Sequence, residues 1–328
     1  MKDVRRYERI VVSLKSEVTI IGAGIIDVLA GPVDESVFEK GSQPVNSTRL
    51  AFGGDALNEA VVLSQLGAQV ELISKVGNDE AGKQVLDFLQ EKRVDVTKVK
   101  TEADLETGIN IVLVTPDGER MFLTNPNGSL RKLSEADVME QLDSAADIVC
   151  MASMFVSPLL DIPAMERLFQ KIKSKPGRIL VADMTTAKNG ETLADIAGLL
   201  KYIDYLIPNE AEAARLTGEA DVYRNAELFV EHGASCVVIK RGKRGCLICT
   251  KDKQVEIPAY PHVTLIDTTG AGDSFVAGFL WGLKQGMPLE ECARFGCAVA
   301  SCTIETLGAN GAIDSAELPL KRYEEMKR

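Results

Sequence analysis

Short apolar segments rich in β-branched residues alternate along most of the chain with amphipathic segments of helical periodicity. Strands are predicted at residues 18–24, 70–76, 109–114, 148–151, 179–183, 205–207 and 237–240. Helices are predicted between them, among other places at 56–66, 80–92, 165–173 and 210–216. Such alternation is typical of a parallel sheet with helices on both faces, in which ligands bind at the carboxyl ends of the strands. The sequence therefore predicts a doubly wound α/β fold with a mostly parallel central sheet.

Two segments, 28–51 and 107–124, interrupt this alternation. The second alternates apolar and polar residues around Pro116, Asp117 and Gly118, which is a hairpin signal and not that of a crossover helix. Because each segment leaves and re-enters the main sheet, we expect the two to form a small β-sheet lid over one edge of the ligand site. Exposed apolar faces on such hairpins would also favour a homodimer that forms through the lid. We assign residues 1–17 to an N-terminal extension, 18–319 to one domain that carries the lid, and 320–328 to a C-terminal tail.

The charge balance limits the class of ligand. The formal net charge is -11 and no dense run of Lys and Arg occurs, so nucleic acid is an unfavourable partner. An anionic ligand must then be held by local groups, namely backbone amides, helix N-termini and Mg²⁺.

The seven cysteines, an odd number, favour reduced thiols over a disulfide framework. Cys246 and Cys249 form a C-x-x-C pattern, but in a strand predicted at 245–250 they point to opposite faces, which argues against a shared metal or redox site. No apolar run reaches the roughly 18 residues of a membrane span, and the N-terminal residues lack the apolar core of a signal peptide. We therefore expect a cytoplasmic protein with no membrane partner.

A glycine-rich turn, D-T-T-G-A-G-D at residues 267–273, opens a long amphipathic helix. Gly270 and Gly272 let the backbone approach a ligand closely, and the unpaired amides at the helix start carry a partial positive charge. Phosphate oxygens suit such a place, and a carboxylate there, Asp273, can take the proton of a substrate hydroxyl. The alternative is that Asp273 only stabilises the helix dipole. The chain contains no Walker A pattern.

This motif resembles the C-terminal signature of the ribokinase-like (PfkB) carbohydrate kinase family. The G-G-D-A-L-N of residues 53–58 resembles the N-terminal G-G-x-x-x-N of that family, and the N-E-A-E of residues 209–212 resembles its N-x-x-E. The order and spacing of the three motifs also match, so the resemblance covers roughly residues 18–319. It implies a kinase that transfers a phosphoryl group from ATP to a hydroxyl of a small sugar-like molecule.

The resemblance also implies roles for single residues. Asp273 becomes the catalytic base, and the amides of Gly270, Ala271 and Gly272 form an anion hole for the transferred phosphoryl group. The K-R-G-K-R-G of residues 240–245 resembles the family's loop beside the nucleotide. The implied ATP-binding residues are Asn209, Lys240, Gly242, Lys243, Gly245 and Gly272. The alternative for this loop is an ordinary basic hairpin turn.

Two kinds of ion follow from the same resemblance. Asn209 and Glu212 match positions that organise Mg²⁺ and its waters near the phosphates, whereas the alternative for Glu212 is a solvated helix residue. The T-L-G-A of residues 306–309 resembles a loop that binds a monovalent cation such as K⁺ through carbonyl oxygens in many relatives. The implied residues of that cation site are Asp267, Thr269, Thr303, Thr306 and Gly308.

At the substrate end, Asp27 matches a family aspartate that accepts hydrogen bonds from sugar hydroxyls. The implied substrate-binding residues are Asp27, Gly53, Gly54, Asp55 and Asn58. Residues 22–24 read G-A-G and could begin a dinucleotide fingerprint, but its sixth position is Asp27 where glycine or alanine is needed, so NAD is not expected.

The chain departs from ribokinase at three substrate-side positions, since ribokinases carry Asn at Ile25, Lys at Asp55 and Glu at Val156. Ribose is therefore a doubtful substrate. The carboxylate of Asp55 would repel a phosphate on the substrate, which favours an unphosphorylated sugar. The alternative for Asp55 is a helix cap. At the level of function, a nucleoside kinase and a non-catalytic sugar-binding sensor of the same fold remain the alternatives.

Overall fold

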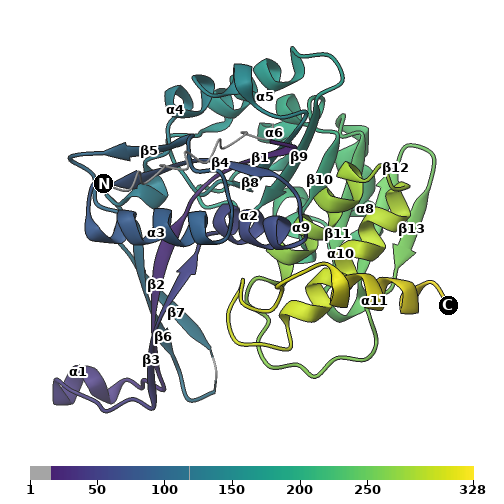
Figure 1. Cartoon of the computed structure of the whole chain (residues 1–328). Helices are drawn as coiled ribbons and strands as arrows, with labels where there is room; N and C mark the ends of the chain where they lie inside the picture. Colours follow the sequence, from purple (N-terminus) through teal and green to yellow (C-terminus); the bar gives the residue numbers. More distant parts are fainter. Residues whose placement is uncertain (1–15, 118) are drawn as a thin grey trace, which may run out of the picture.

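The computed structural model describes residues 16–117 and 119–328. The N-terminal extension predicted at 1–17 lies, up to residue 15, outside the described residues, and so does Gly118 of the predicted hairpin turn. In the described part, one large sheet with helices on both faces carries a smaller sheet on one side (Figure 1).

Nine strands of the described chain form the large sheet. In sheet order they are β13 (Gln254–Ile257), β12 (Cys246–Thr250), β11 (Cys236–Lys240), β10 (Tyr205–Ile207), β9 (Ile179–Met184), β8 (Ile148–Met154), β1 (Val18–Ile21), β4 (Val70–Gly77) and β5 (Val99–Glu102). All neighbours from β11 to β5 are parallel, and β12 is antiparallel to both of its neighbours. The predicted doubly wound, mostly parallel sheet is confirmed.

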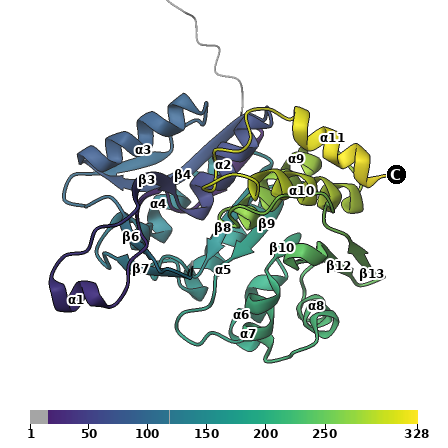
Figure 2. The ribbon, with the colours of Figure 1, turned by 90° about the horizontal axis from the view of Figure 1, so that it is seen from below.

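Helices cover both faces of this sheet and bury two separate apolar cores. One core is covered by α2 (Asp55–Gln65), α3 (Glu80–Glu91), α9 (Ala271–Lys284), α10 (Leu289–Thr303) and α11 (Glu317–Met326). The other is covered by α4 (Glu135–Met139), α5 (Ile162–Lys173), α6 (Leu193–Leu200), α7 (Glu210–Thr217) and α8 (Val222–Glu231). Figure 2 shows α2, α9, α10 and α11 gathered on one side and α6, α7 and α8 on the other. Three 3₁₀ turns complete the described helices, η1 (Ser129–Arg131), η2 (Leu142–Ser144) and η3 (Gly242–Arg244).

The small sheet is the predicted lid. Its strand order is β3 (Ser47–Gly53), β2 (Ile25–Gly31), β6 (Ile109–Val114) and β7 (Arg120–Thr124), and the short helix α1 (Ser36–Lys40) lies between β2 and β3. The β2–β3 and β6–β7 pairs are antiparallel, whereas β2 and β6 are parallel. In Figure 1 the lid hangs from the large sheet, with α1 at its far end. Its first two strands begin before residue 28 and end after residue 51, so this lid segment is longer than the sequence predicted.

The first strand is shorter than predicted. β1 ends at Ile21, and the chain then turns through residues 22–24 into β2 of the lid. The reason is the close approach of α2, because a Cβ atom at Gly22 would lie 2.8 Å from the Cβ atom of Ala56. The break after β1 is therefore the point at which the chain leaves the large sheet for the lid.

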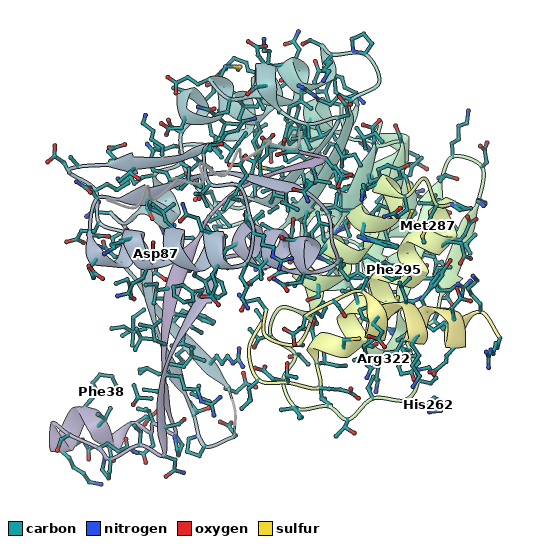
Figure 3. The ribbon with its side chains drawn as sticks, in the orientation of Figure 1. Phe38, Asp87, His262, Met287, Phe295 and Arg322 are labelled. Carbon is teal, nitrogen blue, oxygen red and sulfur yellow. The ribbon has the colours of Figure 1, made fainter. Side chains whose placement is uncertain are left out.

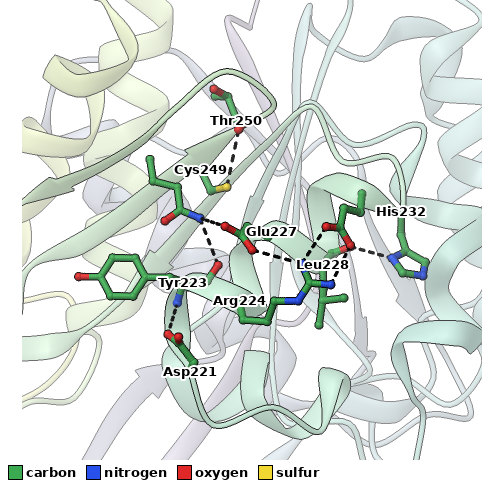
Figure 4. A network of polar contacts seen from close by, with 10 residues as sticks. Asp221, Tyr223, Arg224, Glu227, Leu228, His232, Cys249 and Thr250 are labelled. Atoms are coloured by element: carbon green, nitrogen blue, oxygen red, sulfur yellow. Dashed lines mark hydrogen bonds and ion pairs between the residues drawn. The ribbon is translucent and has the colours of Figure 1, made fainter.

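Hydrogen bonds at helix ends explain why several helices begin where they do. The Asp161 carboxylate accepts from the amide of Ala164, so α5 begins at Ile162, three residues before the predicted start. At α8, Asp221 accepts from the amide of Tyr223, and Arg224 pairs with two glutamates farther along the helix (Figure 4). The ion pairs of Arg224 are exposed, and exposed ion pairs of this kind add little stability.

The cysteines pack as free thiols. All seven are buried, and none forms a disulfide. Cys246 belongs to the core under α9 and α10, whereas Cys249 belongs to the opposite core, as the predicted strand geometry requires. No helix in the described ranges is long and apolar enough to span a membrane.

The C-terminal residues continue the fold. Residues 320–328, predicted as a tail, lie mostly in α11, which packs on α10. The guanidinium of Arg322 donates to Ser301 Oγ at 3.0 Å, and the ring of Tyr323 meets the edge of Phe295. Figure 3 labels Phe295 of α10 and Arg322 of α11.

Candidate active site

A cavity of about 930 Å³ opens at the carboxyl ends of β9, β10 and β11. Asp183 near the end of β9, Asn209 two residues after β10 and Lys240 at the end of β11 all line it. The start of α9 closes the other side with Gly272 and Asp273. Parallel sheets bind ligands at this edge, so the fold itself brings these distant residues together.

The glycine turn before α9 has the conformation that its sequence predicts. Gly270 is the N-cap of α9 with φ 72°, in the left-handed region that favours glycine. The backbone of Ala309 passes so close to Gly270 that a Cβ atom there would collide with it. The first turn of α9 therefore faces the cavity through Ala271 and Gly272. Among the described residues the amide of Gly272 donates no hydrogen bond, whereas the amide of Ala271, predicted for the anion hole, donates to the carbonyl of Thr268 at 3.2 Å.

Asp273 is the third residue of α9, and a hydrogen bond fixes its side chain. Asn58 of α2 donates from Nδ2 to Asp273 Oδ2 at 2.7 Å. Asn310 in turn donates to Asn58 Oδ1 at 3.0 Å and to the carbonyl of Phe52 at 3.0 Å. Three distant segments thus hold the carboxylate in one place.

The environment of Asp273 favours a proton on its carboxylate. Burial raises the pKa of Asp273 well above its usual value, and the negative charge of Asp55 raises it further. The hydrogen bond from Asn58 and the positive charge of Lys240 act in the opposite direction. A carboxylate with a raised pKa is a stronger base once it is ionised.

Lys240 forms a buried ion pair with Asp183. Its Nζ lies 2.6 Å from Oδ1 and 2.8 Å from Oδ2 of Asp183. Burial lowers the pKa of Lys240, but the charges of Asp183 and Glu212 outweigh burial and hold it above its usual value. A Cβ atom at Gly272 would lie 3.6 Å from this ammonium, so Lys240 brings a positive charge against the glycine turn.

Asn209 and Glu212 form a capping box at the start of α7. Asn209 Oδ1 accepts from the amide of Glu212 at 2.9 Å, and Glu212 Oε2 accepts from the amide of Asn209 at 2.7 Å. Glu212 is buried, which does not agree with a solvated helix residue, and burial raises its pKa. The remaining oxygen, Oε1, accepts no hydrogen bond from the described residues.

The basic loop after β11 lines the same cavity with Gly242, Lys243 and Gly245. Arg241 and Arg244 are held by Glu210, and Arg241 also pairs with Glu256. Lys243 is exposed. The two arginines thus form ion pairs that stabilise the loop. Lys243 lines the cavity and could contact an anionic ligand there.

The predicted cation loop lies next to the glycine turn. The Asp267 carboxylate accepts from the amides of Thr269 and Gly308, each at 3.0 Å, and pairs with Arg120 of the lid at 2.8 Å. Burial raises the pKa of Asp267, but these hydrogen bonds outweigh burial and hold it below its usual value. The lid therefore contacts the glycine turn through Arg120.

The other two threonines of this predicted site flank the end of α10, since Thr303 is its last residue and Thr306 lies in the loop that follows. The hydroxyl of Thr303 is buried and donates to Ser274 at 2.7 Å. The hydroxyl of Thr306 donates to the carbonyl of Thr303 at 3.3 Å. Both hydroxyls thus donate hydrogen bonds within the protein.

The substrate-side residues lie on the lid strands β2 and β3 and at the start of α2. Asp27 Oδ1 accepts from Asn110 Nδ2 at 2.9 Å, and burial raises the pKa of Asp27. Gly53 packs against this carboxylate so closely that a Cβ atom would overlap it, and Gly54 is the N-cap of α2. Asp55 is the first residue of α2 rather than its cap, and its carboxylate accepts from the hydroxyl of Ser153.

Several residues of the site were not singled out from the sequence. They are Glu59, Asn110, Arg120, Ser153, Asp183 and Asn310. Asp183 could have been found, since it is a charged residue near the end of a predicted strand. Glu59 is fully buried, Cys150 Sγ donates to it at 3.3 Å, and its Oε1 has no hydrogen-bond partner among the described residues. Burial, then the charge of Asp183, raises the pKa of Glu59 well above its usual value, which favours its neutral form.

Comparison with known proteins agrees with this geometry. A model of the pfkB family of carbohydrate kinases matches residues 15–316. A ribokinase of Haemophilus influenzae is 31% identical over 281 residues, which cover 84% of this chain and 88% of that protein. The solved Arabidopsis thaliana ribokinase in complex with ribose and ATP shares the fold with a TM-score of 0.80, at 23% identity over 95% of this chain and 99% of that one. A protein of E. coli in complex with ATP and Mg²⁺ also shares it, with a TM-score of 0.78, at 20% identity over 94% of this chain and 99% of that one.

Proposed function

The chain belongs to the pfkB family of carbohydrate kinases, which are ATP-dependent phosphotransferases, and we propose that its substrate is a small unphosphorylated sugar or sugar-like alcohol. The observation that carries the proposal is the carboxylate of Asp273, fixed by Asn58 beside the glycine turn and the ammonium of Lys240. The proposal assigns Asp55 to the sugar side, where its negative charge disfavours a phosphate ester.

In the proposed reaction Asp273 accepts the proton of the substrate hydroxyl while that oxygen bonds to the γ-phosphorus of ATP. The bond from phosphorus to the β-γ bridging oxygen breaks, and ADP leaves. The amides of Gly270 and Gly272, with Lys240 beside Gly272, stabilise the negative charge on the transferred group. Because such a transition state is loose, the base is needed mainly for positioning and late proton transfer.

We propose that Mg²⁺ accompanies ATP and is held through water by Glu212 and Asn209. The donor set fits this ion, since Glu212 Oε1 accepts no hydrogen bond from the described residues and Mg²⁺ prefers carboxylate oxygen and retained water. When bound, Mg²⁺ neutralises charge on the ATP phosphates. The capping box fixes the position of both side chains before the ion arrives.

A K⁺ ion is proposed at the neighbouring loop through backbone carbonyls. No hydrogen bond between described residues uses the carbonyl oxygens of Asp267, Thr269, Thr306 or Gly308. The Asp267 side chain is already neutralised by Arg120, so the carbonyls are the oxygens left for a cation.

The lid carries an exposed apolar row that supports a homodimer. Leu50, Val28, Ile111 and Leu123 are direct partners in the strand pairing, so they share one face of the lid. Leu50, Ile111 and Leu123 are 55%, 45% and 55% exposed. We propose that a second copy of the chain covers this row. The buried free cysteines and the use of ATP support a place in the cytoplasm.

The experiment that tests the function is a screen of ADP release with neutral sugars, polyols, sugar acids, sugar phosphates and nucleosides. The proposal expects ADP release with an unphosphorylated sugar-like alcohol. A preference for a nucleoside would support the nucleoside kinase alternative instead. ADP release that is independent of any added alcohol would contradict a sugar kinase.

A further inference from the structure

A second, smaller cavity of about 260 Å³ adjoins the proposed sugar site. Two chain segments connect it to the main cavity. At the end of β8, Ser153 bonds to Asp55 of the main cavity, and Phe155 and Val156, which follow the strand, line the second one. At the end of β9, residues 183–185 line the main cavity, and Lys188 in the loop after the strand lines the second one. The two cavities are therefore neighbours along both segments.

Two cations, Arg131 and Lys188, line the second cavity. Arg131 ends η1, Lys188 lies in the loop after β9, and neither side chain makes a hydrogen bond or ion pair with the described residues. The two carboxylates of the cavity are already in use, because Asp161 caps α5 and Glu191 accepts from the backbone and side-chain amides of Asn189. Among the described residues, no carboxylate pairs with Arg131 or Lys188, although Asp161 and Glu191 also line the cavity.

The charges of this cavity and of the sugar site act on each other. Desolvation lowers the pKa of Lys188, the positive charge of Arg131 lowers it further, and the negative charge of Asp55 raises it. Lys188 is exposed as a residue, so this desolvation is partial. An anion bound between Arg131 and Lys188 would relieve their repulsion within reach of the substrate held at Asp55.

The backbone beside the cavity is strained. Phe155 has φ 73°, a left-handed conformation that is unfavourable for a bulky side chain. Strain of this kind persists where the surrounding structure enforces it, and it is concentrated at ligand sites. Val156 follows directly, at the position where ribokinases carry a sugar-binding Glu. The wall of the cavity is apolar here, which strengthens the attraction between its cations and an anion.

We propose that Arg131 and Lys188 bind a negatively charged substituent of the substrate and that this substituent is a carboxylate, so that the substrate is a sugar acid. The inference rests on the proposed kinase function of the adjoining site. Arg131 and Lys188, which no carboxylate of the described residues pairs with, can each bond to one oxygen of a substrate carboxylate. The carboxylates of Asp55, Asp161 and Glu191 disfavour the second negative charge of a phosphate dianion, whereas a neutral sugar would leave both cations without a partner.

The test compares matched substrates with the full-length protein. A panel of aldoses, their aldonic and uronic acids and their phosphate esters is assayed for ADP release. We expect an acid to exceed its neutral parent sugar at least about tenfold in kcat/KM, since charge-assisted pairing is lost with the neutral sugar. A neutral sugar or a phosphate ester as the best substrate would overturn the proposal.

Variants then assign the effect to the two cations. We expect Arg131→Gln and Lys188→Gln each to lower kcat/KM for the acid about tenfold, through KM, and to change the neutral sugar less than about twofold. Lys132→Gln, which follows Arg131 but does not line the cavity, is the matched control and should behave as the parent. Equal losses on the acid and on the neutral sugar would mean that the cations serve the structure alone and would overturn the proposal.

A binding measurement separates this inference from the kinase function. If no member of the panel gives ADP release above that of Asp273→Asn, the proposed function fails. Calorimetric titration of gluconate and glucose into the parent and into Lys188→Gln then tests the cavity alone. Tighter gluconate binding by the parent supports an anion site, and equal or absent binding by both proteins contradicts it.

Discussion

Asn58 donates a 2.7 Å hydrogen bond to the carboxylate of Asp273, although 215 positions separate the two residues in the sequence. The bond joins α2, which follows the lid, to α9, which follows the glycine turn. The proposed base is thus held by the helix that directly follows the first lid segment.

Asn58→Ala should lower kcat about tenfold, because Asp273 loses the contact that positions it. The hydrogen bond from Asn58 lowers the pKa of Asp273, so its loss should raise that pKa further. The acid limb of the pH profile of kcat/KM should then move to higher pH. Asn310→Ala removes the hydrogen bond from Asn310 to Asn58 but not the one from Asn58 to Asp273, so it should shift the acid limb of the pH profile less. An unchanged acid limb in Asn58→Ala would contradict the role of Asn58 in holding Asp273.

Asp55→Asn should move the acid limb of the pH profile of kcat/KM to lower pH. The negative charge of Asp55 raises the pKa of Asp273, so its removal lowers that pKa, and the ionised base persists to lower pH. The same variant should lose part of the discrimination against phosphate esters. Steady-state kinetics from pH 5 to pH 8 on a sugar and its phosphate measures both effects. Asp252→Asn, on an exposed turn, is the control.

Lys240→Met should lower kcat about 10²-fold, since the transferred group loses a positive charge at the glycine turn. It should also destabilise the fold by about 3–5 kcal/mol, because Asp183 is left buried without its partner. The double variant Asp183→Asn/Lys240→Met removes both charges and should recover much of the stability but not the activity. Thermal unfolding and kinetics on both proteins separate the two roles, and recovery of activity in the double variant would remove Lys240 from catalysis.

The central sheet could be predicted from the sequence because strand and helix signals are local. Periodicity located β4, β6 and β10 almost to the residue, since each is bounded by turn residues. The end of β1 could not be read in the same way. The segment 18–31 is apolar except for Thr19 and Asp27, and only packing of Gly22 against α2 shows where the chain leaves the sheet.

The residues of the candidate site also differ in how far the sequence could predict them. Motifs with a fixed spacing predicted Asp273, Asn209 and Glu212, because each motif lies within one short segment of the chain. Asp183 and Arg120 act through partners far away in sequence, Lys240 and Asp267, and no local pattern marks such a pair. The cations of the second cavity lie 57 positions apart, so only the folded chain brings them to one place.

The homodimer has a test of its own. Ile111→Lys with Leu123→Lys places charges in the exposed apolar row of the lid and should convert a dimer to a monomer without unfolding it. Light scattering at micromolar concentration measures the mass of both proteins. A parent protein that is monomeric under these conditions would contradict the lid interface. Lys substitutions at Leu159 and Leu318, which are exposed outside the lid, are the control.

The most direct test of the account is the turnover of Asp273→Asn. The variant should keep ATP binding and lower kcat by about 10²–10⁴, the range for loss of a positioned general base. It should fold at least as stably as the parent at neutral pH, because a carboxyl whose pKa is raised by folding costs stability once the pH exceeds its unfolded value. A loss of turnover in a stable, ATP-binding protein would support Asp273 as the base. Activity within about threefold of the parent would contradict the mechanism proposed for this chain.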